Sequence, residues 1–194
     1  MLLELNQLNL FSKASLKFTS AGRPDTLLMD SNALVHWKSD IAKHQQRARE
    51  SKSAFQGTLF DLAPVPNDPD AIDPFSLKLQ SMAFWRFPSD SKGSACIYFI
   101  IDGAAELLLY VGETCRSNLR WKGEHDCKRY IANYQDLHYR HGLKTAVNMV
   151  FWWDTPVNTR LRQQMEAALI AKWKPPFNKE NWRMWQTPFI GKKQ

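Results

Sequence analysis

Two neighbouring apolar runs restrict the fold of this chain more than any other feature of its sequence. Residues 95–102 and 107–112 are mostly apolar and include the β-branched and aromatic types that favour strands. Gly103 lies in the short segment between them, where a turn needs a flexible residue. This pattern predicts a β-hairpin. A third run, residues 146–154, is rich in Val, Phe and Trp and predicts another strand.

Two helices are predicted in this half of the chain, one after the hairpin and one after the third strand. Residues 117–135 predict one helix, with a few apolar anchors on one face. Residues 157–174 predict a stronger one, which Pro175 and Pro176 end because proline cannot continue a helix. Its apolar positions recur at four-residue steps, at Leu161, Met165, Leu169 and Trp173.

The first half of the chain has a different composition. Residues 31–52 predict a helix that Ser31 can cap. Residues 61–74 contain four prolines and four aspartates, which is typical of an extended acidic linker. We therefore expect three regions: a mostly helical extension over residues 1–60, a linker over 61–75 and a domain over 76–194 that contains the predicted strands.

Composition argues against several classes of protein. The longest apolar stretch, residues 96–111, is interrupted by Asp102, Gly103 and Glu106 and is too short to span a membrane. The N-terminus lacks the basic region and cleavage site of a secretion signal, so we expect a cytoplasmic protein. Three cysteines without a CxxC pair argue against a disulfide framework and against a zinc site.

The positive charge is concentrated in the second half. Of the 26 Lys and Arg residues, ten lie in residues 1–90, where ten Asp and Glu balance them. The remaining 16 lie in residues 91–194 with only nine acidic residues, so this half carries the whole net charge of +7. Such a domain suits a polyanionic partner such as DNA. The alternative is a basic surface that only keeps the protein soluble.

Five chemically suitable residues occur on these predicted elements, in a recognisable order. Two are tyrosines in short strand motifs, Cys96-Ile97-Tyr98 and Tyr110-Val111-Gly112. An arginine follows ten residues after the second tyrosine, and a glutamate lies in the later helix with an asparagine twelve residues beyond it. In chain order the five are Tyr98, Tyr110, Arg120, Glu166 and Asn178.

Residues 96–178 therefore resemble the GIY-YIG nuclease family, including the nuclease half of bacterial excision-repair incision proteins. Cys96 replaces the usual glycine of the first motif, and the first ninety residues match nothing in this motif set. The resemblance implies an α/β (α+β) fold with a small antiparallel three-stranded sheet flanked by helices. The mostly helical N-terminal extension would precede it.

The resemblance also implies an activity, metal-dependent hydrolysis of DNA phosphodiesters. Glu166 would bind one Mg²⁺ or Mn²⁺, because hard cations prefer carboxylate oxygens. Arg120 would hold the phosphate and stabilise the transition state. We favour Tyr98 as general base and Tyr110 as the residue that orients water or phosphate. His125, one turn beyond Arg120, would contact phosphate or share in proton transfer. The basic residues expected to contact DNA nearby are Arg116, Lys122, Lys128 and Arg129.

Each of these residues also has an ordinary structural interpretation. The two tyrosines suit a core, and Arg120 suits an exposed helix face. His125 suits the surface, and Asn178 suits a turn after two prolines. Glu166 is harder to explain in this way, because it lies in an apolar run where a buried carboxylate needs a partner.

Two short segments in the first half resemble the peptide with which bacterial replication and repair proteins bind the sliding clamp. Both have the form Gln-x-x-Leu-Phe, in which the Leu-Phe pair would fill an apolar pocket. The first consists of Gln7, Leu10 and Phe11, and the second of Gln56, Leu59 and Phe60. The alternative is that these pairs pack on their own domain.

These observations predict a compact, nucleoid-associated endonuclease of DNA repair or recombination that acts on branched or mismatched DNA and is recruited by the sliding clamp. Two alternatives stay open. One is a type II-like restriction endonuclease, and the other is a non-catalytic DNA-binding or clamp adaptor that has kept the fold.

Overall fold

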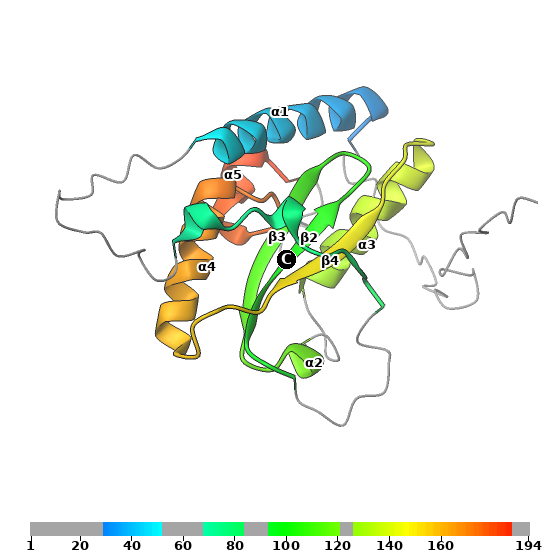
Figure 1. Ribbon diagram of the computed structural model, residues 1–194. Helices are drawn as coiled ribbons and strands as arrows, with labels where there is room; N and C mark the ends of the chain where they lie inside the picture. Colours follow the sequence, from blue (N-terminus) through cyan, green and yellow to red (C-terminus); the bar gives the residue numbers. More distant parts are fainter. Residues whose placement is uncertain (1–28, 52–67, 84–92, 121–125, 188–194) are drawn as a thin grey trace, which may run out of the picture.

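A computed structural model describes residues 29–51, 68–83, 93–120 and 126–187 (Figure 1). The α-helices are α1 (Ser31–Glu50), α2 (Ser117–Arg120), α3 (Asp126–Arg140), α4 (Thr159–Trp173) and α5 (Trp182–Trp185). The strands are β1 (Gln80–Ser81), β2 (Cys96–Asp102), β3 (Leu107–Thr114) and β4 (Val147–Trp152). The 3-10 turns within these described ranges are η1 (Pro69–Ala71), η2 (Pro74–Ser76) and η4 (Lys179–Asn181).

The strands form one antiparallel sheet in the order β1-β4-β2-β3. The predicted mixed α and β fold is confirmed, but the sheet has four strands where three were expected. The additional strand, β1, pairs only Gln80 and Ser81 with β4. Two residues are too few for the alternating pattern by which a strand is recognised in a sequence.

The central hairpin of β2 and β3 is as predicted, and its register determines which side chains share a face. Tyr98 lies opposite Gly112 and Ile100 lies opposite Tyr110. The register shifts by one residue between Ile100 and Ile101. Because side chains alternate along a strand, Tyr98 and Tyr110 are on the same face of the sheet.

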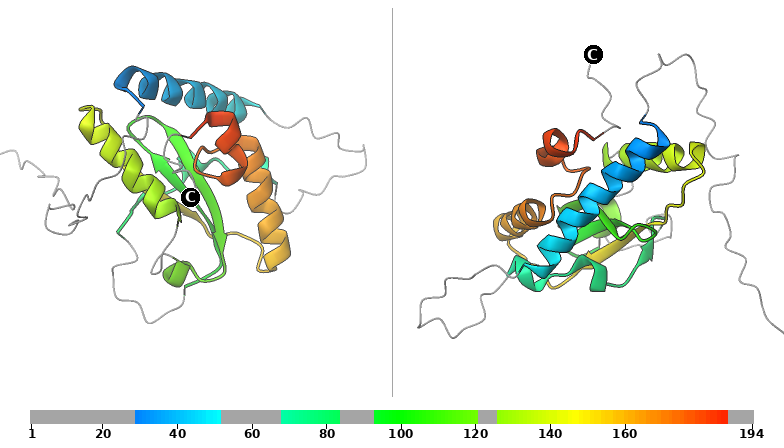
Figure 2. Two further views of the ribbon diagram at one scale, coloured as in Figure 1. Left: turned by 180° about the vertical axis from the view of Figure 1, so that it is seen from behind. Right: turned by 90° about the horizontal axis from the view of Figure 1, so that it is seen from above.

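Helices cover both faces of this sheet (Figures 1 and 2). On the face that carries Tyr98 and Ile100, the core includes side chains from α1 and α3. On the opposite face, Ile97 and Phe99 share a core with α4. All seven residues of β2 are buried, as expected of a central strand packed on both sides.

Helix boundaries follow local hydrogen bonding. Asp30 rather than Ser31 caps α1, since its carboxylate accepts from the Ala33 amide at 2.8 Å. Asn158 caps α4, which ends where Lys174 adopts a left-handed conformation before the two prolines. Residues 117–135, expected as one helix, contain α2 and part of α3, with 121–125 outside the described residues. Among the described residues, no helix is long and apolar enough to cross a membrane.

The C-terminal part of the expected linker packs against the domain. The turns η1 and η2 lie beside α4, where Asp70 forms an ion pair with Lys172 at 2.7 Å. The Phe75 ring contacts the Trp173 ring edge-on, with centroids 5.8 Å apart, and Ile72 is buried in the same core. Proline and aspartate here cap two short turns rather than forming an extended tether.

Candidate active site

The two motif tyrosines lie side by side on one face of the hairpin. Their ring centroids are 6.0 Å apart and their planes differ by 28°. The Tyr110 hydroxyl is hydrogen-bonded to the Tyr98 hydroxyl. Tyr98 is 0% exposed, whereas Tyr110 is only partly buried.

Gly112 makes this arrangement possible. A Cβ at this position would overlap the Tyr98 ring and hydroxyl and would lie 2.8 Å from Cε1 of Tyr110. Only glycine leaves room for a phenol directly across the strand pair. The glycine of the second motif is therefore explained by packing around the first motif's tyrosine.

Arg120, on the short helix α2, reaches back to the tyrosine pair. Its Nε donates to the Tyr98 hydroxyl at 3.4 Å. Burial raises the pKa of Tyr98 well above its usual value, although the Arg120 charge acts in the opposite direction. Burial also raises the pKa of Tyr110. Both phenols are therefore protonated at neutral pH in the protein alone.

The outer edge of β3 connects the remaining motif residues to the hairpin. The Asn178 side chain accepts from the Val111 amide and donates to the Val111 carbonyl, both at 2.9 Å. Gln45 of α1 forms the same paired contact with Leu108, both bonds at 2.8 Å. These side chains occupy main-chain groups that an edge strand would otherwise leave unpaired. Asn178 thus fixes the segment after α4 against β3.

Glu166 is attached to the same edge. Its Oε1 accepts from the Glu113 amide at 3.1 Å, and the side chain is half-buried. Burial, together with the nearby carboxylates of Glu113 and Glu180, raises the pKa of Glu166 to about 7, although the Glu113 amide and the charge of Arg120 act in the opposite direction. The site therefore holds a carboxylate whose surroundings favour a cation or a proton.

An ion pair beside Glu166 was not predicted from the sequence. Arg162 is 0% exposed, and its Nε lies 2.6 Å from Oε2 of Glu113. The same guanidinium donates to the carbonyls of Pro156 and Val157, both at 3.1 Å. The only sequence signals are an acidic residue late in a strand and an arginine in a helix, and neither indicates which partner it has.

A cavity of about 450 Å³ brings most of the motif residues together. Its walls come from β3, α2, α3, α4 and the segment after α4. The motif residues that line it are Tyr110, Arg120, Glu166 and Asn178. Two cations that no sequence pattern indicated, Lys174 and Lys179, also line it. Tyr98 lies behind Tyr110 and Arg120 rather than in the wall.

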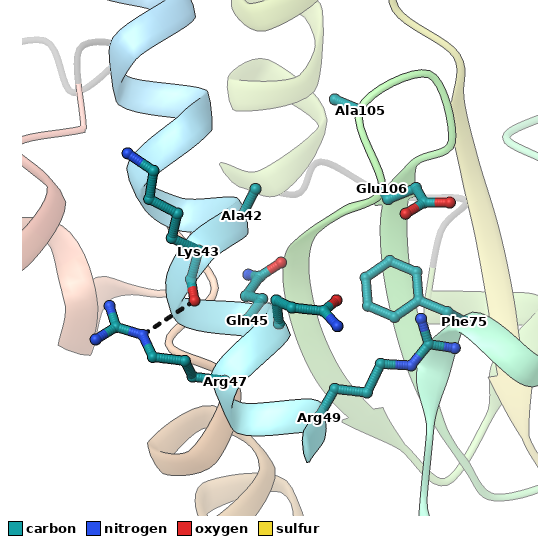
Figure 3. Close-up of a pocket in the computed structure, with 9 residues that line it drawn as sticks. Ala42, Lys43, Gln45, Arg47, Arg49, Phe75, Ala105 and Glu106 are labelled. Carbon is teal, nitrogen blue, oxygen red and sulfur yellow. Dashed lines mark hydrogen bonds between the residues drawn. The ribbon is translucent and has the colours of Figure 1, made fainter. Parts of the chain in front are cut away.

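A larger cavity of about 630 Å³ lies elsewhere, between α1, η2 and the β2–β3 turn (Figure 3). Its two arginines already have partners. Arg49 is paired with Asp73 at 2.7 Å, and Arg47 donates to the Lys43 carbonyl at 3.1 Å. None of the predicted catalytic residues lines it. The smaller cavity is therefore the better candidate for an active site, because the predicted catalytic residues line it.

The donor set of the smaller cavity suits Mg²⁺ or Mn²⁺ bound mainly through water. Such ions often use one or two carboxylates and keep several water ligands. Glu166 provides one carboxylate with surrounding negative charge, while Glu113 is occupied by Arg162. No group of three or more His, Cys, Asp or Glu side chains placed to hold a metal occurs among the described residues. A bound ion would therefore depend on Glu166, with water and the exposed Glu180 of the same cavity as further ligands.

The predicted DNA-contacting residues have different surroundings. Arg116 is exposed, and Lys128 is half-buried. Arg129 is exposed and is paired with Asp126 at 3.4 Å. Outside the described residues lie Lys122, His125 and both clamp-type segments with Gln7, Leu10, Phe11, Gln56, Leu59 and Phe60.

Comparisons with protein-family models, with curated proteins and with solved structures found no match for this chain.

Proposed function

We propose that this protein is a GIY-YIG-type endonuclease that hydrolyses DNA phosphodiesters with one Mg²⁺ or Mn²⁺. The observation that carries the proposal is the joint presence of Tyr110, Arg120 and Glu166 in one cavity. Tyr110 and Arg120 come from the adjacent elements β3 and α2, whereas Glu166 comes from α4, which lies much further along the chain. A guanidinium can stabilise charge on phosphorus, a carboxylate can hold a divalent cation, and a phenol can orient the phosphate or the attacking water.

Each side chain has a role that fits its surroundings. Arg120 and the cavity lysines neutralise the phosphate, and Arg120 stabilises the negative charge that develops on phosphorus. Tyr110 lines the cavity and orients the phosphate or the attacking water. Tyr98 is covered by Arg120, so it positions that guanidinium, and its predicted role as general base would require Arg120 to move aside. Asn178 holds the cavity wall in place.

Glu166 would hold the cation, and the cation would supply charge stabilisation and an activated water. Burial and the negative charge of Glu113 raise the pKa of Glu166, and the positive charge of a bound cation would lower it. Cation binding and deprotonation of Glu166 would therefore favour each other.

The proposal is tested by a cleavage panel with supercoiled plasmid, four-way junctions, flaps, mismatched duplex and plain duplex, in Mg²⁺ or Mn²⁺. Glu166→Gln keeps the acceptor for the Glu113 amide and removes the charge. We expect it to lower cleavage by at least about 100-fold while DNA binding persists. Glu106→Gln is the matched control, because it removes an exposed carboxylate that lines the other cavity.

Three results would distinguish the alternatives. Equal cleavage by the parental protein and Glu166→Gln contradicts the proposed site. DNA binding without cleavage of any substrate favours the non-catalytic adaptor. Cutting at one short sequence regardless of DNA shape favours a restriction enzyme.

Recruitment by the sliding clamp is a separate proposal that rests on the sequence alone. A peptide covering residues 1–15 is expected to bind a bacterial clamp. A peptide with Leu10 and Phe11 replaced by alanine is the control. Equal binding of the two peptides, or none of either, would rule out this segment.

A further inference from the structure

The connection from β4 to α4 and the first turn of α4 expose three large apolar side chains to solvent. Trp153 is 50% exposed, Val157 89% and Leu161 49%. Exposed apolar side chains grouped in this way mark surfaces that bind something. Trp153 is the largest of them and has the most defined surroundings.

Trp153 lies next to the candidate active site. In the sheet, Phe151 is directly opposite Tyr98. Trp153 stacks on Phe151, with ring centroids 5.0 Å apart and an interplanar angle of 18°. The indole is therefore on the same face of the sheet as the tyrosine pair. Trp153 comes directly after β4, diagonal to Tyr98, a separation of about 7–8 Å in antiparallel sheets.

The indole is held in place but is not covered. Phe151 is buried in the same core as Tyr98, so the ring beneath Trp153 is fixed. Half of the indole still faces water. A rigid aromatic ring with one covered side is the form of platform on which nucleobases stack.

The position of this platform relative to the cavity suggests what would occupy it. β2 lies between β4 and β3, so Trp153 and the cavity are on opposite sides of Tyr98. Arg116 is exposed just beyond β3, at the end of the sheet where β4 also ends. A strand whose phosphate lies at Arg120 can therefore pass Arg116 at this end of the sheet and bring a neighbouring nucleotide to Trp153.

We propose that Trp153 stacks on an unpaired base of the substrate strand beside the scissile phosphate. In continuous duplex the bases are stacked on each other and are not available to a protein ring. The proposal thus names the substrate class as DNA with an unstacked nucleotide near the cut, such as a flap or another junction of single and double strand. It rests on the proposed nuclease function.

Binding of fluorescent DNA by the full-length protein, measured by anisotropy in Ca²⁺ or EDTA, tests the inference without requiring cleavage. The probes are a 5′-flap, a single strand and a plain duplex of equal length. We expect Trp153→Ala to weaken flap and single-strand binding about tenfold and duplex binding by less than about twofold. Trp153→Phe keeps a ring and is expected to retain most of the affinity.

Tyr139→Ala is the matched control. Tyr139 is an aromatic residue that is 81% exposed, at the C-terminal end of α3 and so at the opposite end of β4 from Trp153 (Figure 1). This variant is expected to bind all three probes normally. Urea unfolding of each variant shows that it is folded at the assay temperature.

The results separate this inference from the proposed function. Flap binding by Trp153→Ala equal to that of the parental protein overturns the inference, even if the parental protein cleaves DNA. In that case, a protein partner would be the better explanation of the exposed apolar side chains. An equal loss on flap and duplex overturns it as well, since it shows no preference for unstacked bases. A selective loss supports it, even if no cleavage is found.

Discussion

Replacement of Arg162 by methionine is expected to be among the most destabilising changes in this domain. The guanidinium is 0% exposed and contacts the Glu113 carboxylate at 2.6 Å. It also donates to the carbonyls of Pro156 and Val157 at 3.1 Å, and to the Thr159 hydroxyl at 3.3 Å. Methionine has a similar shape but would leave a largely buried carboxylate and two carbonyls without these donors. Breaking a buried pair in this way costs about 3–5 kcal/mol.

Urea unfolding followed by circular dichroism measures this cost, and a double-mutant cycle assigns it. Glu113→Gln removes the charge that Arg162→Met leaves unpaired, so the double variant should recover at least about half of the loss. Arg160→Met, an exposed arginine on the same helix, should change stability by less than about 0.5 kcal/mol. A loss below about 1 kcal/mol for Arg162→Met, or strict additivity in the cycle, would refute the reasoning.

Three further outcomes are expected. Gly112→Ala should cost about 1–3 kcal/mol of unfolding free energy, because its Cβ overlaps Tyr98. Asn178→Ala should cost about 1–3 kcal/mol, because it leaves the buried amide and carbonyl of Val111 unpaired, and urea titration checks both variants. Burial lowers the pKa of His138, so the unfolded chain takes up a proton more readily there. Stability should therefore fall as the pH drops below about 6.5, and His138→Gln should reduce this slope between pH 7 and 5.

The parts of the fold that local sequence determines were predictable. The hairpin, β4 and α4 each have a pattern that is repeated over several residues, and their boundaries differ from the predicted ones by about two residues. Residues 68–76 were not predictable in this way. Their prolines and aspartates have the same composition in a tether and in capped turns, and only the packing of Ile72 and Phe75 against α4 distinguishes the two.

Within the candidate site, the sequence indicated which residues to consider but not how they are connected. Motif order identified Glu166 and Asn178, because the resemblance preserves spacing. It did not identify the side chains that hold β3, Gln45 among them, because their partners are main-chain groups far away in the sequence. Nor did it show that Tyr98 is enclosed while Tyr110 lines the cavity. Both are tyrosines in strands with similar sequence patterns. The difference between them arises from Arg120, which packs over Tyr98 and leaves Tyr110 at the cavity.

The edge position of β3 explains how these connections fix the residues of the candidate site. An edge strand has unpaired main-chain groups, and here Asn178 and Glu166 bond to Val111 and Glu113 on that edge. The position of the Glu166 carboxylate is therefore set by backbone rather than by flexible side chains. Glu113 lies close enough to raise the pKa of Glu166, yet its own charge is matched by the buried Arg162. We infer that this pairing leaves Glu166 as the backbone-held carboxylate available to a cation, with the exposed Glu180 as a second carboxylate at the same cavity. One ion that keeps most of its water ligands suits such a site.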